Sequence, residues 1–140
     1  MKLVIDANEL FSSIIGKGKG RETKKLDILF SDKIELYAPF KLLAELEKNK
    51  GEIKSKSGFS DIDFEVFLAI LKLRIKFVET DKFANKIAEA KGICGDPKDI
   101  QYIALAMVLN CAIWSGDKEL KNQVRVEVYN TKELIEKFGV

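Results

Sequence analysis

The sequence contains no histidine, and this absence removes a large group of enzyme mechanisms. Ser-His-Asp and Cys-His hydrolysis, histidine proton relays and histidine-bound zinc all require that side chain. The two cysteines, Cys94 and Cys111, are too few for a zinc site without histidine. Both lie beside apolar residues, so we expect buried free thiols in a cytoplasmic protein rather than a disulfide. Any hydrolytic chemistry must therefore depend on carboxylates, lysines or metal ions.

Long apolar segments are absent as well. No run approaches the ~20 apolar residues that cross a bilayer, and the N-terminus lacks the apolar region of a secretion signal. We therefore expect no membrane partner. The 24 basic and 22 acidic residues leave a formal net charge of +2, which is not by itself a nucleic-acid signature. With 140 residues, 46% apolar content and no linker or repeat, the chain is expected to fold as one domain over residues 1–140.

Strand and helix patterns alternate along the chain. The expected strands cover 3–6, 34–38, 76–78, 112–115 and the alternating segment 124–128, and the expected helices cover 8–15, 22–30, 39–51, a segment beginning at 60, 80–91, 97–109 and 131–138. Strands separated by helices of about 10–15 residues indicate a parallel sheet with helices on both faces. The expected fold class is therefore α/β.

Local signals set the expected helix boundaries. Pro39 is expected to begin one helix and Gly51 to end it. Ser60 begins a capping motif, and Thr80 is expected to cap the helix that follows. The side chains expected to face inward are Leu26, Leu29 and Phe30 in one helix, and Phe64, Phe67, Leu68 and Leu71 in another.

Four acidic residues fall where a parallel sheet places side chains at one edge. Asp6 follows the first expected strand and Asp117 follows the fourth, whereas Glu45 and Asp99 belong to helices beside the same edge. Ligands of such sheets bind outside the carboxyl ends of the strands. Carboxylates gathered from distant parts of a chain repel one another unless a cation lies among them, and Mg²⁺ or Mn²⁺ prefers oxygen ligands. This arrangement favours a metal-dependent nuclease.

Each acidic residue also has a structural explanation. Asp6 could cap the following helix, and Asp117 could be an ordinary turn residue. Asp96 precedes Pro97 and is typical of a helix N-cap, while Asp99 would suit the helix dipole whatever its function.

Periodicity alone leaves one acid unassigned. Glu45 and Glu47 flank the apolar stripe of their helix on opposite sides by a similar angle, so the pattern does not choose between them.

Two basic segments are candidate contacts for phosphate. The loop 16–21 contains Lys17, Lys19 and Arg21 and resembles a phosphate cradle, but it lacks the spacing and final Ser or Thr of a nucleotide P-loop. The second segment contains Lys48, Lys50, Lys54 and Lys56. For both segments, plain solvated surface and contact with nucleic acid remain equally open.

Four segments in a fixed order resemble the PIN-domain family of ribonucleases. They are Val4-Ile5-Asp6-Ala7-Asn8, then Pro39 with Leu42-Leu43-Ala44-Glu45-Leu46, then Asp96-Pro97-Lys98-Asp99 leading into Ala104-Leu105-Ala106, and finally Ser115-Gly116-Asp117-Lys118-Glu119-Leu120. No single motif is specific, whereas the four together cover almost the whole chain. The resemblance implies an α/β/α sandwich around a parallel sheet of about five strands.

The resemblance also implies an activity and a set of site residues. The activity is Mg²⁺- or Mn²⁺-dependent cleavage of single-stranded RNA, leaving 5′-phosphate and 3′-hydroxyl ends. The implied acidic metal set is Asp6, Glu45, Asp99 and Asp117, with Asp96 as an outer partner to the metal waters. Asn8 and Ser115 occupy positions that support the metal or the bound phosphate.

Possible protein partners follow from the same resemblance. Some family members are toxins of toxin–antitoxin pairs and others act in RNA maturation or decay, so an antitoxin is one candidate partner. Many relatives form homodimers, and a two-fold dimer is the commonest closed assembly.

Two rival functions are weighed against this one. A haloacid dehalogenase-type phosphotransferase would also place an aspartate after its first strand, but it would require a second aspartate where Asn8 stands. The stronger rival is a non-catalytic module that keeps the fold and binds RNA or a protein without cutting. The presence of all four acids argues against a domain that has lost the cleavage activity.

Overall fold

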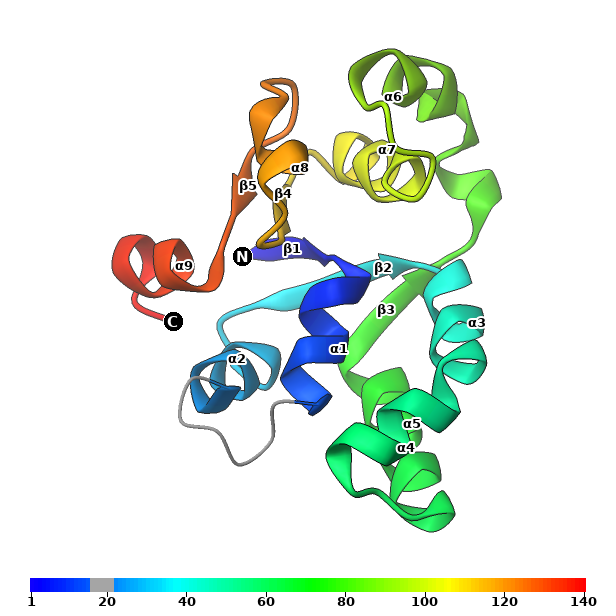
Figure 1. Cartoon of the computed structure of the whole chain (residues 1–140). Helices are drawn as coiled ribbons and strands as arrows, with labels where there is room; N and C mark the ends of the chain where they lie inside the picture. The colour runs from blue at the N-terminus through cyan, green and yellow to red at the C-terminus, as the bar shows by residue number, and fades with distance from the viewer. Residues whose placement is uncertain (16–21) are drawn as a thin grey trace.

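A five-stranded, all-parallel sheet forms the centre of the protein, which is represented by a computed structural model that describes residues 1–15 and 22–140 (Figure 1). The spatial order of the strands is β3-β2-β1-β4-β5. Their bounds are β1 Lys2–Ile5, β2 Glu35–Pro39, β3 Ile75–Val78, β4 Ala112–Trp114 and β5 Val128–Tyr129. Every neighbouring pair is parallel. The predicted α/β class with about five parallel strands is confirmed.

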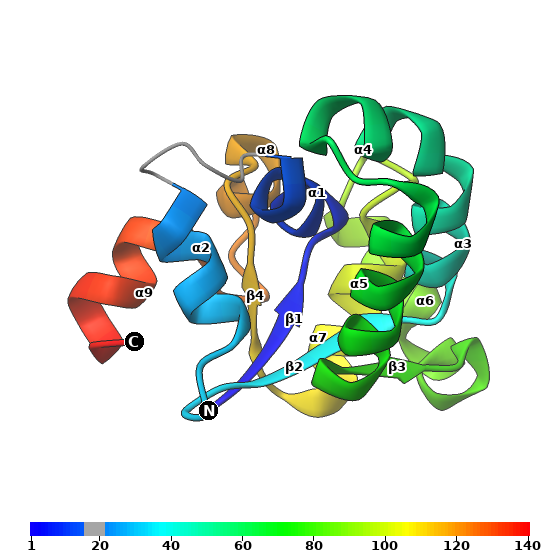
Figure 2. The same cartoon turned by 90° about the horizontal axis from the view of Figure 1, so that it is seen from below.

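Helices cover both faces of this sheet. They are α1 Ala7–Ile15, α2 Glu22–Leu29, α3 Lys41–Lys48, α4 Lys50–Ser57, α5 Asp61–Arg74, α6 Ile87–Ile93, α7 Ile100–Leu109, α8 Lys118–Asn122 and α9 Thr131–Phe138, with two short 3₁₀ turns, η1 Thr80–Lys82 and η2 Ala84–Lys86, before α6. Figure 2 looks onto the face with α1, α2, α4 and α5, and α7 lies on the far side of β1 and β2. This is the predicted α/β/α sandwich.

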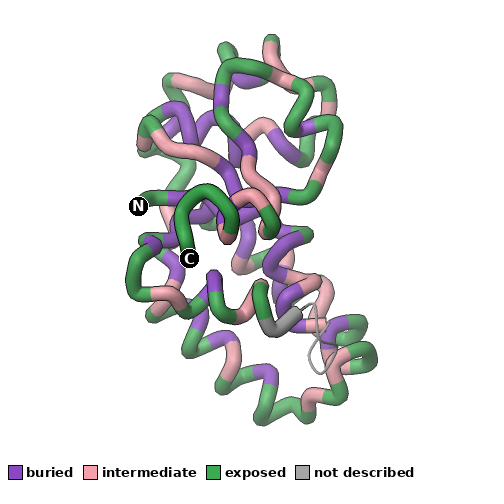
Figure 3. The backbone as a smooth tube through the Cα atoms, turned by 90° about the vertical axis from the view of Figure 1, so that its left-hand side faces the viewer, coloured by how far each residue is buried: buried purple, intermediate pink, exposed green. Residues whose placement is uncertain are grey.

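The core lies between these layers and includes both faces of the central strands. Leu3, Val4 and Ile5 of β1 are fully buried, as expected for a parallel strand covered on both sides (Figure 3). The Trp114 ring at the end of β4 is also fully buried, and its Nε1 donates a hydrogen bond to Thr131 Oγ1 at 3.1 Å. A rigid core therefore fixes the two central strand ends, where the candidate site begins.

Two helix starts follow the sequence signals closely. Ser60 and Asp63 form a capping box at the start of α5, and Asn130 and Glu133 form another at the start of α9. Phe64, Leu68 and Leu71 are buried as predicted, and Phe67 is half-buried against the same core.

The predicted helix 39–51 was wrong at both ends. Pro39 is the last residue of β2, and α3 begins at Lys41. Gly51 does not end a helix, because it lies inside α4; Gly58, with a φ of 79°, ends that helix instead. The single expected helix is therefore two helices that meet at Asn49, whose Nδ2 donates to the carbonyl of Glu45 at 2.8 Å.

Three other local expectations were wrong. Thr80 caps no α-helix and instead begins the 3₁₀ turn η1, with α6 starting only at Ile87. Val124 is 98% exposed because β5 begins only at Val128 and ends at Tyr129. In the turn before it, Gln123 hydrogen-bonds to both the backbone N–H and the carbonyl of Val126. Phe30 is exposed, since it lies one helical step beyond the buried Leu29.

Neither cysteine forms a disulfide, and both are half-buried rather than fully buried. Within the described residues, no helix combines the length and apolar character needed to span a membrane.

Candidate active site

Five acidic side chains line one pocket of about 470 Å³ at the carboxyl edge of the sheet. They are the four predicted acids, Asp6, Glu45, Asp99 and Asp117, together with Asp96, and Asn8 lines the same pocket. Ile5 of β1 pairs with Trp114 of β4, so the segments that carry Asp6 and Asp117 leave the sheet side by side. The helices α3 and α7 bring the remaining acids to the same edge. The sequence therefore correctly predicted that these residues converge.

Ser115 links the two acids that follow the central strands. Its Oγ donates to Asp6 Oδ2 at 2.9 Å and accepts from the backbone N–H of Asp117 at 3.0 Å. Asp6 is only 5% exposed. Burial raises the pKa of Asp6, the Ser115 hydrogen bond partly opposes this shift, and the negative charges of Glu9 and Asp117 add to it. Ser115 thus holds the Asp6 carboxylate in one orientation and favours its charged form.

Asp117 both caps a helix and lines the pocket. Its Oδ1 caps α8 by accepting from the backbone N–H of Glu119 at 2.9 Å and of Leu120 at 3.4 Å. It also lines the acidic pocket. The sequence did not predict α8, whose single apolar anchor is the buried Leu120.

Asp99 carries the strongest electrostatic perturbation among the pocket acids. It occupies the N-cap position of α7 but makes no side-chain cap hydrogen bond, and it is 9% exposed. Burial raises its pKa to about 6, and repulsion from Asp6, Asp96 and Asp117 contributes to the shift. Asp96 is more exposed, and its Oδ1 accepts from the backbone N–H of Lys98 at 3.0 Å, so it caps the turn before α7 rather than the helix itself.

The structure separates Glu45 from Glu47, which periodicity could not. Glu45 is half-buried and lines the pocket, whereas Glu47 is exposed. Lys41 Nζ lies 3.7 Å from Glu45 Oε1 and donates to the carbonyl of Lys98 at 3.1 Å, which ties α3 to the turn before α7. The same ammonium lies 5.2 Å from the centre of the Tyr102 ring.

Two residues of this region, Tyr102 and Glu9, were missed from the sequence. Tyr102 lines the pocket and is 2% exposed, and its hydroxyl has no hydrogen-bond partner within the described part of the chain. Its pKa is raised by burial and then by the charge of Glu45. The buried Glu9 lies behind Asp6, with Oε2 at 3.2 Å from Lys25 Nζ in an ion pair that lacks hydrogen-bond geometry. Because Glu9 follows Asp6 by three residues on α1, helical spacing could have indicated it.

The turn between Ser115 and Asp117 needs a small residue. A Cβ on Gly116 would lie 2.9 Å from Glu9 Oε1, so Glu9 and this turn pack directly against each other. Glu9 therefore contributes to the position of Asp117 as well as to the charge beside Asp6.

The pocket suits a divalent cation by its chemistry, although its ligands are not drawn together. Of residues 1–15 and 22–140, no three acidic or cysteine side chains stand close enough to enclose an ion. The available donors are carboxylate oxygens, which Mg²⁺ and Mn²⁺ prefer. Burial first, and then the negative charges of neighbouring carboxylates, raise the pKa of Asp6 and of Asp99, and a bound cation would relieve the repulsive part. The donor set of the pocket therefore fits such an ion by its chemistry.

The three predicted loop contacts, Lys17, Lys19 and Arg21, lie outside the described residues. Asn8 and Ser115 both lie at the site, the first lining the pocket and the second bound to Asp6.

Comparison with known proteins establishes the family. The PIN-domain sequence profile matches residues 4–136. The chain belongs to the PIN-domain family. PIN domains are generally nucleases that use divalent metal ions. A search of curated protein sequences found no match.

A solved structure shows the same fold. It is the crystal structure of VapBC2 from Rickettsia felis bound to a DNA fragment from their promoter. The superposition has a TM-score of 0.67 and covers 93% of this chain and 98% of the other, with 18% sequence identity. At this identity the likeness supports the PIN fold itself.

Proposed function

We propose that this PIN domain is a divalent-metal-dependent endoribonuclease that hydrolyses phosphodiester bonds of single-stranded RNA. The observation that carries the proposal is the convergence of Asp6, Glu45, Asp99 and Asp117 from four separate segments onto one pocket. Burial and mutual repulsion raise the pKa of Asp99 to about 6, so the metal-free pocket is held at an electrostatic cost. Proteins keep such strained charge arrangements chiefly at functional sites.

The cavities beside the pocket support a polymeric substrate. A cavity of about 310 Å³ shares Asn8, Phe11 and Asn49 with the acidic pocket, and one of about 600 Å³ shares Asp96 and Asp99 with it. The acidic pocket therefore adjoins two further cavities. We infer that an extended strand would occupy these adjoining cavities, which a mononucleotide would leave empty.

In the proposed mechanism the acidic residues bind the metal ions and their waters. Asp6, Asp99 and Asp117, with help from Glu45, would hold one or two divalent ions, and Asp96 would contact their waters. When bound, the ions would supply an activated water and neutralise charge on the leaving oxygen. Ser115 keeps the Asp6 carboxylate oriented, and the Asn8 amide would support the metal site or the bound phosphate. The products would carry 5′-phosphate and 3′-hydroxyl ends.

The proposed role is that of a cytoplasmic toxin with an antitoxin partner. The support is the likeness to the VapBC2 structure, an assembly bound to promoter DNA. The corresponding arrangement here would pair this chain with a second, DNA-binding protein that restrains the nuclease.

We also propose a homodimer formed through α5. Ile62, Val66, Ile70 and Leu73 are all exposed and form one apolar stripe along this helix. Glu65 and Lys72 lie two turns apart beside the stripe, with opposite charges. An antiparallel pairing of two copies would bring Glu65 of one opposite Lys72 of the other, as an isologous two-fold interface requires.

The direct test is cleavage of a fluorescent single-stranded RNA in Mn²⁺ and in EDTA. We expect cutting only with Mn²⁺, and we expect Asp6→Asn to abolish it while the circular dichroism spectrum stays unchanged. Asp32→Asn, an exposed aspartate outside the pocket, is the matched control and should cut like the parent. RNA binding without cutting in either buffer would favour the non-catalytic module instead.

A further inference from the structure

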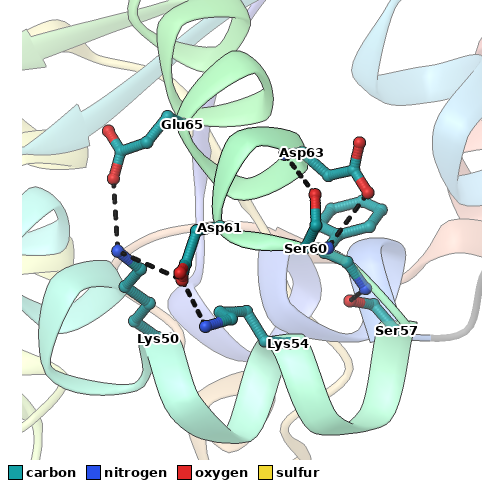
Figure 4. Close-up of polar contacts among 8 residues, drawn as sticks. Lys50, Lys54, Ser57, Ser60, Asp61, Asp63 and Glu65 are labelled. Carbon is teal, nitrogen blue, oxygen red and sulfur yellow. Dashed lines mark hydrogen bonds and ion pairs between the residues drawn. The ribbon is translucent and has the colours of Figure 1, made fainter.

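Most lysines around the acidic pocket are already neutralised within the chain. Lys41 pairs with Glu45, and Lys25 pairs with Glu9. Lys50 and Lys54 both point toward Asp61, and Lys50 also reaches Glu65 (Figure 4). These ammonium groups have local partners and add little field at the pocket.

Lys48 and Lys98 are different. Both are exposed, both line the acidic pocket, and neither Nζ forms an ion pair with any carboxylate in the described part of the protein. Lys48 ends α3, and Lys98 lies in the turn before α7. They are therefore two unpaired positive charges facing into a pocket whose other charged groups are acidic.

Each of these lysines is next in the chain to a residue that lines an adjoining cavity. Lys48 precedes Asn49, which is shared with the cavity of about 310 Å³. Lys98 follows Pro97, which lines the cavity of about 600 Å³. A strand that crosses the acids from one cavity to the other would pass Lys48 on one side and Lys98 on the other.

Tyr102 adds a neutral donor between them. Its hydroxyl is buried near the Glu45 carboxylate, and no group in residues 1–15 and 22–140 forms a hydrogen bond with it. A buried polar group without a hydrogen bond is costly, so a ligand oxygen at this position would be bound favourably.

We propose that Lys48, Lys98 and the Tyr102 hydroxyl form a phosphate-binding wall that holds the phosphodiester backbone on both sides of the scissile phosphate. The inference rests on the proposed nuclease function, because it assigns the substrate path through the same pocket. The carboxylates of the pocket repel the negatively charged RNA backbone, so other groups must hold the backbone in place. The two lysines act as point charges on flanking phosphates, and the phenol donates to a non-bridging oxygen.

Fluorescence anisotropy in EDTA tests binding without cleavage. A labelled single-stranded RNA and a DNA of the same sequence are titrated with the parent, Lys48→Ala, Lys98→Ala and the control Lys54→Ala. Lys54→Ala removes the same charge from a lysine already bonded to Asp61. We expect Lys48→Ala and Lys98→Ala to weaken binding about three- to tenfold and to flatten the slope of log K against log [salt] by about 0.7 each. The control should stay within about twofold of the parent.

Tyr102→Phe tests the third group. Tyr37→Phe is its control, since Tyr37 is also largely buried but lies on β2 away from the pocket. We expect Tyr102→Phe to weaken RNA binding about threefold without lowering the urea midpoint, because this hydroxyl has no hydrogen-bond partner within residues 1–15 and 22–140. Tyr37→Phe should bind RNA like the parent.

The outcomes separate this inference from the proposed function. Equal affinities and salt slopes for Lys48→Ala, Lys98→Ala and Lys54→Ala would overturn the phosphate wall, even if the parent cuts RNA. If Lys48→Ala and Lys98→Ala changed the Mn²⁺ affinity and left the RNA affinity unchanged, the phosphate wall would also be overturned, because the lysines would then only offset the negative charge of the carboxylates. If the parent protein never cuts RNA but Lys48→Ala and Lys98→Ala weaken RNA binding as expected, the phosphate wall is supported and the nuclease function is rejected. Comparison of the RNA and DNA titrations shows which polymer the wall holds more tightly.

Discussion

Replacing Asp99 by asparagine should make the metal-free protein more stable near pH 8. Burial and three neighbouring aspartates raise the pKa of Asp99 from its ordinary 3.8 to about 6. A difference of about two pKa units corresponds to about 3 kcal/mol. Water in the open pocket and the nearby Lys41 screen this repulsion, so we expect a gain of about 1–2 kcal/mol. The amide is nearly the same size, and no cap hydrogen bond is lost at this position.

The pH dependence identifies the cause of this gain. Below about pH 4, Asp99 is protonated in both the folded and the unfolded chain, so it costs nothing. Between about pH 4 and 6 the unfolded chain releases the proton first, and the stability of the parent falls relative to that of the variant. Above about pH 6 the full cost is present. The difference between Asp99→Asn and the parent should therefore grow from near zero at about pH 4 to its maximum above about pH 7.

Urea denaturation in EDTA at a series of pH values measures this difference, with Asp32→Asn as the control for loss of an exposed aspartate. Saturating Mn²⁺ should then stabilise the parent more than Asp99→Asn, because only ligands of the folded state add stability. An Asp99→Asn variant that is no more stable than the parent near pH 8 would refute the repulsion argument. A gain that persists unchanged at about pH 4 would refute it equally.

Three further changes test other parts of the account. Ser115→Ala removes the hydrogen bond that lowers the pKa of Asp6, so the Asp6 carboxyl should hold its proton to a higher pH. Calorimetry should therefore show a larger loss of Mn²⁺ affinity near pH 6 than near pH 8, and equal losses would contradict this role of Ser115. Asp117→Ala should cost about 1 kcal/mol in urea denaturation through the lost α8 cap, whereas Asp117→Asn should keep the cap and still lose cleavage. Val66→Glu places a charge in the α5 stripe and should give a monomer in sedimentation velocity where the parent is a dimer; a monomeric parent at micromolar concentration would remove the proposed interface.

The fold was predictable because its main signals are local or periodic. Fully apolar runs such as Leu3-Val4-Ile5 indicate buried parallel strands, and capping motifs such as Ser60 with Asp63 set helix starts. The helix α4 was missed because Ile53 is its one buried side chain, so it shows no apolar periodicity. The strand expected over 124–128 alternates in sequence, but only its last residue, Val128, belongs to β5, which pairs with β4 through Val128 and Tyr129.

The candidate site was predictable as far as strand ends determine it. Asp6 and Asp117 follow neighbouring strands, and parallel pairing brings them together. Periodicity alone could not choose Glu45 over Glu47, because that choice depends on which side of α3 faces the pocket. Tyr102 was hidden within an apolar helix whose burial on all sides gives no sign that one hydroxyl faces a pocket.

The binding of Mn²⁺ measured by isothermal titration calorimetry tests the central claim most directly. The account predicts that the parent takes up one or two ions per chain and that Asp6→Asn loses this uptake, while Asp32→Asn retains it. A parent that binds no Mn²⁺, or an Asp6→Asn variant that binds it as tightly as the parent, would contradict the claim that these carboxylates form a metal site.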